Sequence, residues 1–251
     1  MDDIDALKDR ALELFLDQRA DEALAIIQGD AALSAWAAAN LKQPTCEDQR
    51  GQRFFAILNQ ANRAPSEALA DLLELRGGER VLELGFGGGA GLVRAGRALQ
   101  AGGGGFLGGV DLSLDCVAAT RRALDERGFS DVEVELQAGC VTAIPFPDGA
   151  FDAVMHLNCW YFWPDLGQGL RECARVLRPG GTLLTGSKIE GLRGFFGDRL
   201  AEVREQAFRN VDLEAYEAAA REAGFVDVAS SKEPGAAGQL EGVTVTRATR
   251  P

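Results

Sequence analysis

Apolar residues recur at spacings of three and four through the first part of the chain, which is the pattern of amphipathic helices. One such face near the N-terminus carries Ile4, Leu7, Ala11, Leu14 and Phe15. Pro44 and Pro65 are predicted to divide this run into separate helices, because proline lacks the backbone N–H that a helix interior needs. The pattern therefore predicts a helical cap, or lid, over residues 1–75 that packs on a second domain.

From residue 76 onward, short apolar runs alternate with helical stretches, which is the order of βαβ units around a parallel sheet. The last two runs are separated by a short glycine-containing turn at 235–238, so we predict that they pair antiparallel. The pattern predicts an α/β domain over residues 76–251 with a seven-stranded, mostly parallel sheet and an antiparallel C-terminal hairpin. The predicted strands are Val81–Leu84, Phe106–Leu112, Val132–Gln137, Phe151–Leu157, Thr182–Ser187, Val226–Ser230 and Val243–Thr249.

A glycine-rich turn that directly follows an apolar strand is the strongest local signal for a ligand site. Residues 81–91 read VLELGFGGGAG, and the helix expected next offers free backbone N–H groups at its N-terminus. Asp111 stands at the end of the next predicted strand, where a carboxylate can accept hydrogen bonds from both ribose hydroxyls. These features alone fit two cofactors, because residues 85–90 also satisfy the GxGxxG/A fingerprint of NAD-dependent dehydrogenases.

Three further segments separate the two cofactors. Glu83 lies two residues before the first glycine of the loop, residues 144–152 read IPFPDGAFD, and residues 175–181 read RVLRPGG. Together with the glycine loop, they resemble the class I S-adenosylmethionine-dependent methyltransferases, in particular a small-molecule group with LPF-x-D-x-x-FD and RVLKPGG segments. Residues 158–165 read NCWYFWPD and resemble the NTIYFWPD stretch of one subgroup.

The resemblance covers residues from about 54 to 249. It implies a Rossmann-like fold, S-adenosylmethionine as cofactor, S-adenosylhomocysteine as product, and methyl transfer to a small-molecule acceptor by in-line displacement. An NPPY-like run after the fourth strand is absent, so amino groups of DNA or of protein glutamine are not the expected acceptors. An NAD-dependent oxidoreductase and a catalytically inactive cofactor-binding module of a biosynthetic complex remain as alternatives.

The resemblance also implies which residues surround the cofactor. Asp111 would hold the ribose hydroxyls, Leu112 would flank the adenine, and Asn158 would lie under the methionine end. Cys140 departs from the family pattern, because an aspartate commonly accepts a hydrogen bond from the adenine amino group there and a thiol is a weak acceptor. The full implied set is Glu83, Gly85, Phe86, Gly87, Gly89, Asp111, Leu112, Gly139, Cys140, Val141 and Asn158.

A general base would assist transfer to a hydroxyl or ammonium, and His156 and Tyr161 are the candidates. His156 lies in an apolar run predicted to be a strand covered on both faces, which favours a packing role. Tyr161 follows the strand end, where open α/β sheets bind ligands, so substrate contact and packing both fit it. Trp160, Tyr161 and Trp163 are predicted either to form a wall of the acceptor pocket or to pack under the cap.

Charge and composition narrow the expected partners. A net charge of −12 argues against a nucleic-acid partner, which would require a basic surface. No apolar run approaches the ~20 residues of a membrane span, so a cytoplasmic protein without a membrane partner is expected. The five cysteines lack CxxC spacing and the chain has one histidine, so neither a disulfide framework nor a metal site is expected.

Overall fold

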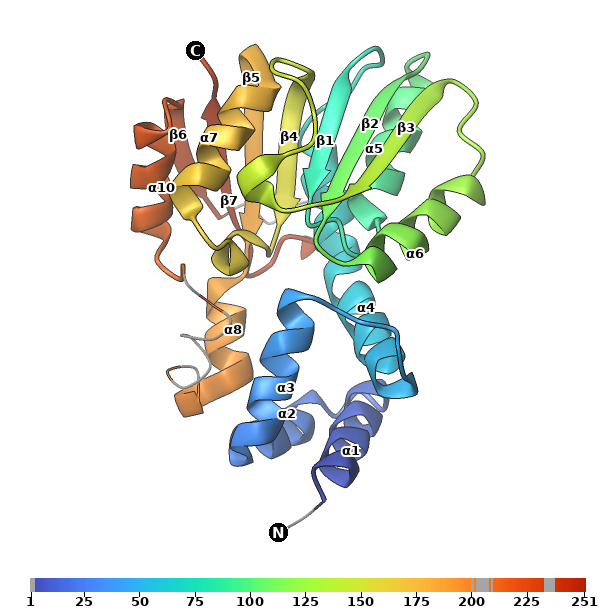
Figure 1. Cartoon of the computed structure of the whole chain (residues 1–251), viewed down its shortest axis with the longest axis vertical. Coiled ribbons are helices and arrows are strands. Elements are labelled where there is room, and N and C mark those ends of the chain that lie inside the picture. Colours follow the sequence, from blue (N-terminus) through green and yellow to red (C-terminus); the bar gives the residue numbers. More distant parts are fainter. Residues whose placement is uncertain (1–2, 200, 202–207, 209, 233–237) are drawn as a thin grey trace.

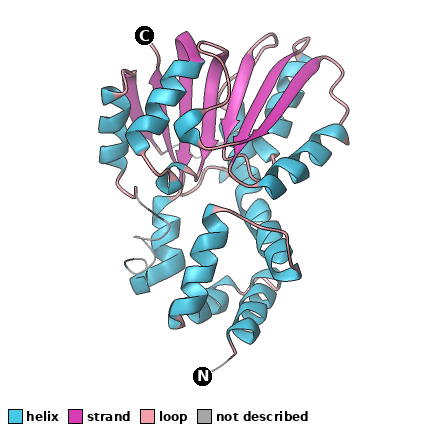
Figure 2. Ribbon diagram, viewed as in Figure 1, coloured by secondary structure: helices cyan, strands magenta, loops and turns pink. Residues whose placement is uncertain are grey.

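A seven-stranded sheet with the order β3-β2-β1-β4-β5-β7-β6 forms one half of the molecule (Figure 2). The computed structural model describes residues 3–199, 201, 208, 210–232 and 238–251. Strands β1 to β5 run parallel, and β7 pairs antiparallel with both β5 and β6. The strands are β1 (Arg80–Leu84), β2 (Gly105–Asp111), β3 (Val132–Ala138), β4 (Phe151–Leu157), β5 (Leu177–Ser187), β6 (Val226–Ser231) and β7 (Thr244–Thr249).

This sheet confirms the predicted fold class and the antiparallel pairing of the last two strands. Most of the turn predicted at 235–238 lies outside the described residues. The central strands β1 and β4 are apolar runs buried along almost their whole length, because helices cover both faces of a parallel sheet. In Figure 1, α7 (Leu166–Val176) crosses in front of the sheet and α5 (Ala90–Ala101) lies behind it.

Polar residues cap the helices that flank the sheet. Ser113 accepts a hydrogen bond from the N–H of Cys116 at the start of α6 (Leu114–Asp125). Asp165 accepts one from the N–H of Gln168 at the start of α7. Asp212 caps α10 (Leu213–Glu222). The remaining described elements here are α8 (Ile189–Phe196) and the 3₁₀ turns η1 (Val141–Ala143), η2 (Trp160–Phe162) and η3 (Gly197–Arg199).

The N-terminal part of the chain forms α1 (Ile4–Leu16), α2 (Ala20–Gly29), α3 (Ala31–Lys42) and α4 (Gln49–Asp71). The predicted break at Pro44 is confirmed, but the predicted break at Pro65 is wrong, because Pro65 lies inside the continuous helix α4. An interior proline costs roughly 3 kcal/mol of helix stability. The helix continues because buried residues on both sides of the proline, Phe54 before it and Leu69 after it, hold both halves in the core.

The N-terminal helices lie at the carboxyl ends of the parallel strands, on the same side of the sheet as α8 (Figure 1). Phe15 of α1 stacks on Phe195 of α8 with ring centroids 6.0 Å apart. The Gln28 side chain of α2 donates a hydrogen bond to the Gly194 carbonyl in the same helix α8. The end of the sheet where ligands bind in open α/β folds is thus flanked by α4 and α8. Among the described helices, none is both long enough and apolar enough to cross a membrane.

Candidate functional site

A cavity of about 330 Å³ opens at the carboxyl ends of β1, β2 and β4. Its inner wall is built from the glycine loop after β1, the end of β2, the turn before η1 and the residues that follow β4. Its outer wall comes from the end of α3 and from α4. Every residue predicted to surround the cofactor lines this cavity except Gly89, which is the N-cap of α5.

Several positions of the glycine loop exclude a side chain, among them one at the cavity and one at the start of α5. Gly85 has φ 64°, and a Cβ there would come within 2.9 Å of the Cys159 Cβ. Gly89 has φ 76°, and a Cβ there would come within 2.4 Å of the Thr120 side chain. Thr120 in turn donates its hydroxyl hydrogen bond to the Gly87 carbonyl at 2.9 Å. The loop is therefore held from behind, and a ligand can approach its backbone closely.

Asp111 connects the glycine loop to the turn after β2. One carboxylate oxygen accepts the N–H of Gly87 and the other accepts the N–H of Ser113, both at 2.9 Å. Burial raises the pKa of this carboxyl group, and the backbone hydrogen bonds partly oppose that shift. The side chain is only 7% exposed, and it lines the cavity. It stands where the predicted contact with ribose hydroxyls requires a carboxylate.

Glu83 is a buried acid in the middle of the sheet. Its side chain lies at the inner wall of the cavity, and its Oε2 atom has no hydrogen-bond partner within the described residues. Burial raises the pKa of this carboxyl group to about 8, while the N–H of Leu92 opposes the shift and the Asp111 charge adds to it. A buried carboxylate without a partner is costly. A cationic ligand group beside Oε2 would remove that cost.

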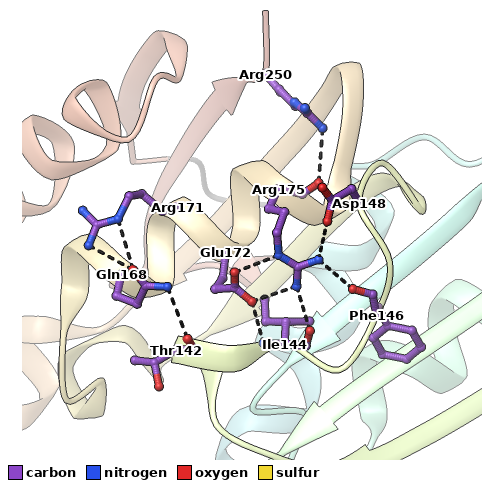
Figure 3. Close-up of polar contacts among 9 residues, drawn as sticks. All are labelled: Thr142, Ile144, Phe146, Asp148, Gln168, Arg171, Glu172, Arg175 and Arg250. Carbon is purple, nitrogen blue, oxygen red and sulfur yellow. Dashed lines mark hydrogen bonds and ion pairs between the residues drawn. The ribbon is translucent and has the colours of Figure 1, made fainter.

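The segment from Ile144 to Asp148 is fastened to α7 by Arg175 (Figure 3). The Arg175 guanidinium donates to the carbonyls of Ile144 and Phe146 and to the carboxylates of Asp148 and Glu172, each at 2.8 Å. This ion pairing lowers the pKa of Glu172. The arginine thereby fixes the IPFPD segment, which follows the Gly139–Val141 stretch of the cavity wall. The IPFPD and RVL segments together hold this part of the wall in place.

The structure places both general-base candidates in the core and not at the cavity. His156 is fully buried, and its Nε2 atom lies 3.1 Å from the Tyr216 hydroxyl and 3.0 Å from the Thr185 hydroxyl. Burial lowers the pKa of His156 to about 3, so the ring is neutral. Tyr161 is 3% exposed, and burial raises the pKa of its phenol. These surroundings support packing roles for both.

The aromatic segment after β4 divides between core and cavity. Trp160 is fully buried against Tyr216, with ring centroids 4.7 Å apart, and like Tyr161 it does not line the cavity. Trp163 does line it, together with its neighbour Phe162. The sequence did not separate the two cavity residues from the two core residues, because a short turn gives no periodicity that tells its two sides apart.

The N-terminal helices supply cavity residues that the sequence analysis missed. From α4 these include the polar residues Asn59, Asn62 and Ser66, and from the end of α3 they include Leu41. The spacing of three and four between residues 59, 62 and 66 marks one helical face and was available as a signal. The loop after α3 is anchored to the β2–α6 turn, since Ser113 donates its hydroxyl hydrogen bond to the Pro44 carbonyl at 2.6 Å.

Residues 82–185, which contain most of this inner wall, match the family model of a methyltransferase domain. The chain carries a class I S-adenosylmethionine-dependent methyltransferase domain. The methyltransferase domain has curated relatives that are themselves named methyltransferases. The 27-O-demethylrifamycin SV methyltransferase of Amycolatopsis mediterranei is 33% identical over 176 residues, which cover 68% of this chain and 62% of that protein. The nocamycin O-methyltransferase of Saccharothrix syringae is 37% identical over 140 residues, covering 55% of this chain and 46% of that protein.

A solved structure agrees with the methyltransferase fold. Geranyl diphosphate methyltransferase in complex with S-adenosylmethionine superposes with a TM-score of 0.59 at 20% identity, over 85% of this chain and 94% of that chain. This structural likeness supports the fold. The assignment to the methyltransferase family rests on the sequence comparisons. The chain spans less than two thirds of the length of the two curated relatives.

S-adenosylmethionine is the cofactor of this family, and the residues of the cavity fit it. The bare glycine loop allows close approach, Asp111 offers a carboxylate beside it, and the unpartnered Oε2 of Glu83 suits the ammonium group of the methionine end. The two acidic side chains also match the net positive charge that the sulfonium gives the cofactor.

Proposed function

We propose that this protein transfers the methyl group of S-adenosylmethionine to an oxygen atom of a small-molecule acceptor by in-line displacement. The observation that carries the proposal is that one cavity joins two kinds of wall. The glycine loop and Asp111 line one part, and apolar side chains that include Leu41, Phe55 and Trp163 line another. The first wall suits the cofactor and the second suits the apolar body of an acceptor. The choice of oxygen rests on the names of the two curated relatives.

The chain's own residues would mainly bind, align and exclude water. When bound, the cofactor supplies a methyl group already activated by a sulfonium, so alignment with the nucleophile is the main requirement. In this proposal Asp111 holds the ribose, Leu112 flanks the adenine, and Glu83 faces the ammonium group. The N-terminal segment 1–75 acts as a lid, since α4 and the end of α3 already line the cavity.

Cofactor choice is tested by isothermal titration calorimetry on the full chain. S-adenosylhomocysteine is expected to bind with saturable heat and NAD is not, because the cavity offers an unpartnered acid for an ammonium group that NAD lacks. Saturable NAD binding without S-adenosylhomocysteine binding would favour the oxidoreductase alternative and overturn the proposal.

Turnover separates an enzyme from a cofactor-binding module. With methyl-labelled S-adenosylmethionine, label is expected to move to apolar alcohols, phenols or carboxylic acids in a panel matched for size. The label should stay off amines of the same carbon skeleton. Binding of the cofactor with no transfer to any member of a broad panel favours the inactive module, and transfer to amines alone contradicts methylation at oxygen.

Deletion of residues 1–40 tests the lid. The deletion leaves α4 and the α3–α4 loop in place, so S-adenosylhomocysteine binding is expected to stay close to that of the full chain while methyl transfer is lost. Circular dichroism verifies the remaining fold. As a milder companion, Phe15→Ala removes the stacking contact with Phe195 and should lower turnover without changing cofactor affinity. Full turnover in the truncated protein would mean that the segment does not act as a lid.

A further inference from the structure

Helix α4 turns a polar face toward the glycine loop. Asn59, Asn62 and Ser66 lie on one side of this helix at spacings of three and four, and all three line the cavity. The Asn59 amide lies directly on the loop, since a Cβ added at Gly88 would come within 2.5 to 2.7 Å of three atoms of that amide. This face of an N-terminal helix is therefore part of the wall near the inner acids of the cavity.

Asn158 joins α4 to the start of α8 through the oxygen and the nitrogen of its side-chain amide. The backbone N–H of Lys188, one residue before α8, donates to Asn158 Oδ1 at 2.8 Å. Asn158 Nδ2 donates to Asn62 Oδ1 at 2.9 Å. Asn158 directly follows β4 and has φ 55°, a left-handed conformation that asparagine tolerates better than most residues. Helix α4 and the start of α8 thus meet at one side chain, and that side chain lines the cavity.

The orientation of the Asn62 amide follows from this chain of hydrogen bonds. A backbone N–H can only donate, so the Asn158 atom that faces Lys188 is oxygen and the atom that faces Asn62 is nitrogen. The oxygen of Asn62 must then accept. Its two N–H groups remain as donors, and no described residue accepts from them.

The cavity lining combines acids, cations such as Arg63 and Arg97, and neutral amides, and the two inner acids restrict where a carboxylate can bind. Glu83 and Asp111 suit the cationic parts and the ribose of the cofactor, but they repel the carboxylate of its methionine end. Neutral amide N–H groups on the opposite wall satisfy a carboxylate without adding charge. Asn62 offers such groups beside Asn158, the residue predicted to lie under the methionine end.

We propose that Asn62, supported by Asn158, is a specificity-determining residue that binds the α-carboxylate of the cofactor, so that an N-terminal helix distinguishes the intact cofactor from its nucleoside fragments. This rests on the proposed function, because it assumes that the cavity holds S-adenosylmethionine. The Rossmann-like domain would bind the nucleoside, and α4 would recognise the amino-acid end.

Two ligands distinguish a loss of recognition of the amino-acid end from a general loss of binding caused by a disturbed fold. S-adenosylhomocysteine carries the α-carboxylate, and 5′-methylthioadenosine has the same nucleoside and thioether without it. Asn62→Asp keeps an oxygen that accepts from Asn158 but removes the donors. We expect this variant to bind S-adenosylhomocysteine about 10- to 100-fold more weakly. Its affinity for 5′-methylthioadenosine should stay within about twofold.

A second variant changes the orientation of the Asn62 amide without replacing Asn62 itself. Asn158→Asp still accepts from the Lys188 N–H but can no longer donate, so the Asn62 amide must turn and give an N–H to the new carboxylate. Affinity for S-adenosylhomocysteine should fall again while that for 5′-methylthioadenosine is kept. Asn40→Asp is the matched control, because Asn40 lies on α3 outside the cavity lining and its side chain donates to the Trp36 carbonyl.

Calorimetry with both ligands on all four proteins gives distinct outcomes. A selective loss for S-adenosylhomocysteine in both cavity variants supports the proposal. Parallel losses for the two ligands mean that Asn62 only supports the fold, and unchanged affinity means that it does not face the carboxylate, so either result overturns the inference. Failure of the unaltered protein to bind either ligand would instead overturn the proposed function.

Discussion

Asp111→Ala is expected to weaken S-adenosylhomocysteine binding by about 1.5–3 kcal/mol, because it removes charge-assisted hydrogen bonds to the ribose hydroxyls. The structure adds a second effect of the same substitution. The Asp111 carboxylate also accepts the N–H of Gly87, so its loss leaves that part of the glycine loop held only by the remaining contacts, which include the bond from Thr120 to the Gly87 carbonyl. The fold should survive, since β2 keeps its pairing with β1 and β3. Calorimetry gives the affinity, and circular dichroism verifies the fold.

A ribose-modified ligand separates the two effects. The 2′-deoxy form of S-adenosylhomocysteine should bind the unaltered protein more weakly than the normal form, and Asp111→Ala should largely abolish that difference. Asp125→Ala is the control, because Asp125 is an exposed acid at the end of α6. If the variant discriminates between the two ligands as well as the unaltered protein does, Asp111 acts on the loop and not on the ribose.

Asn158 shows how far this sequence could be read in advance. The seven strands, the antiparallel C-terminal pair and a ligand site at the glycine loop followed from apolar runs and from motif spacing, because both depend on residues close together in the chain. The bond from Asn158 to Asn62 joins residues far apart in the sequence. No local pattern carried that pairing, so the contribution of α4 emerged only from the structure.

The wrongly predicted helix break and the buried position of an aromatic side chain have a similar physical origin. Pro65 carries a strong local signal for a helix end, but the burial of its neighbours on both sides of α4 overrides that signal. Tyr161 stands in the expected place along the chain, yet the direction of its side chain depends on packing against residues such as Phe208. Local patterns predict the order of the elements, but burial decides whether a helix breaks at a proline and packing decides which way a side chain in a turn points.

The affinity for S-adenosylhomocysteine is expected to rise with pH between about 6 and 8, by up to about tenfold per pH unit. The reason is the buried acid Glu83, whose pKa in the free protein is raised to about 8 by burial. Below that pH the free protein holds a proton on Glu83. An ammonium group beside the carboxylate favours the charged form, so binding must release this proton.

The raised pKa of Glu83 also affects the stability of the ligand-free protein, which changes with pH in the opposite direction to the affinity. Between the ordinary glutamate pKa and about 8, the folded protein binds a proton that the unfolded chain has already released. The free energy of unfolding of the ligand-free protein therefore falls as pH rises through this range. Ligand binding removes that loss, so the thermal shift caused by S-adenosylhomocysteine should be larger at pH 8 than at pH 6.

Glu83→Gln tests both effects, because the amide is close in shape and cannot titrate. The affinity of this variant for S-adenosylhomocysteine should be nearly independent of pH. The difference from the unaltered protein should be largest near pH 8, where the carboxylate of the unaltered protein is charged most easily. Calorimetry in two buffers of different ionisation enthalpy counts the released proton directly. Glu133→Gln, an exposed site on β3, should keep the full pH dependence. Because Glu83 is the acid with an unpartnered oxygen at the cavity wall, an unchanged slope in Glu83→Gln would mean that the ammonium group binds elsewhere.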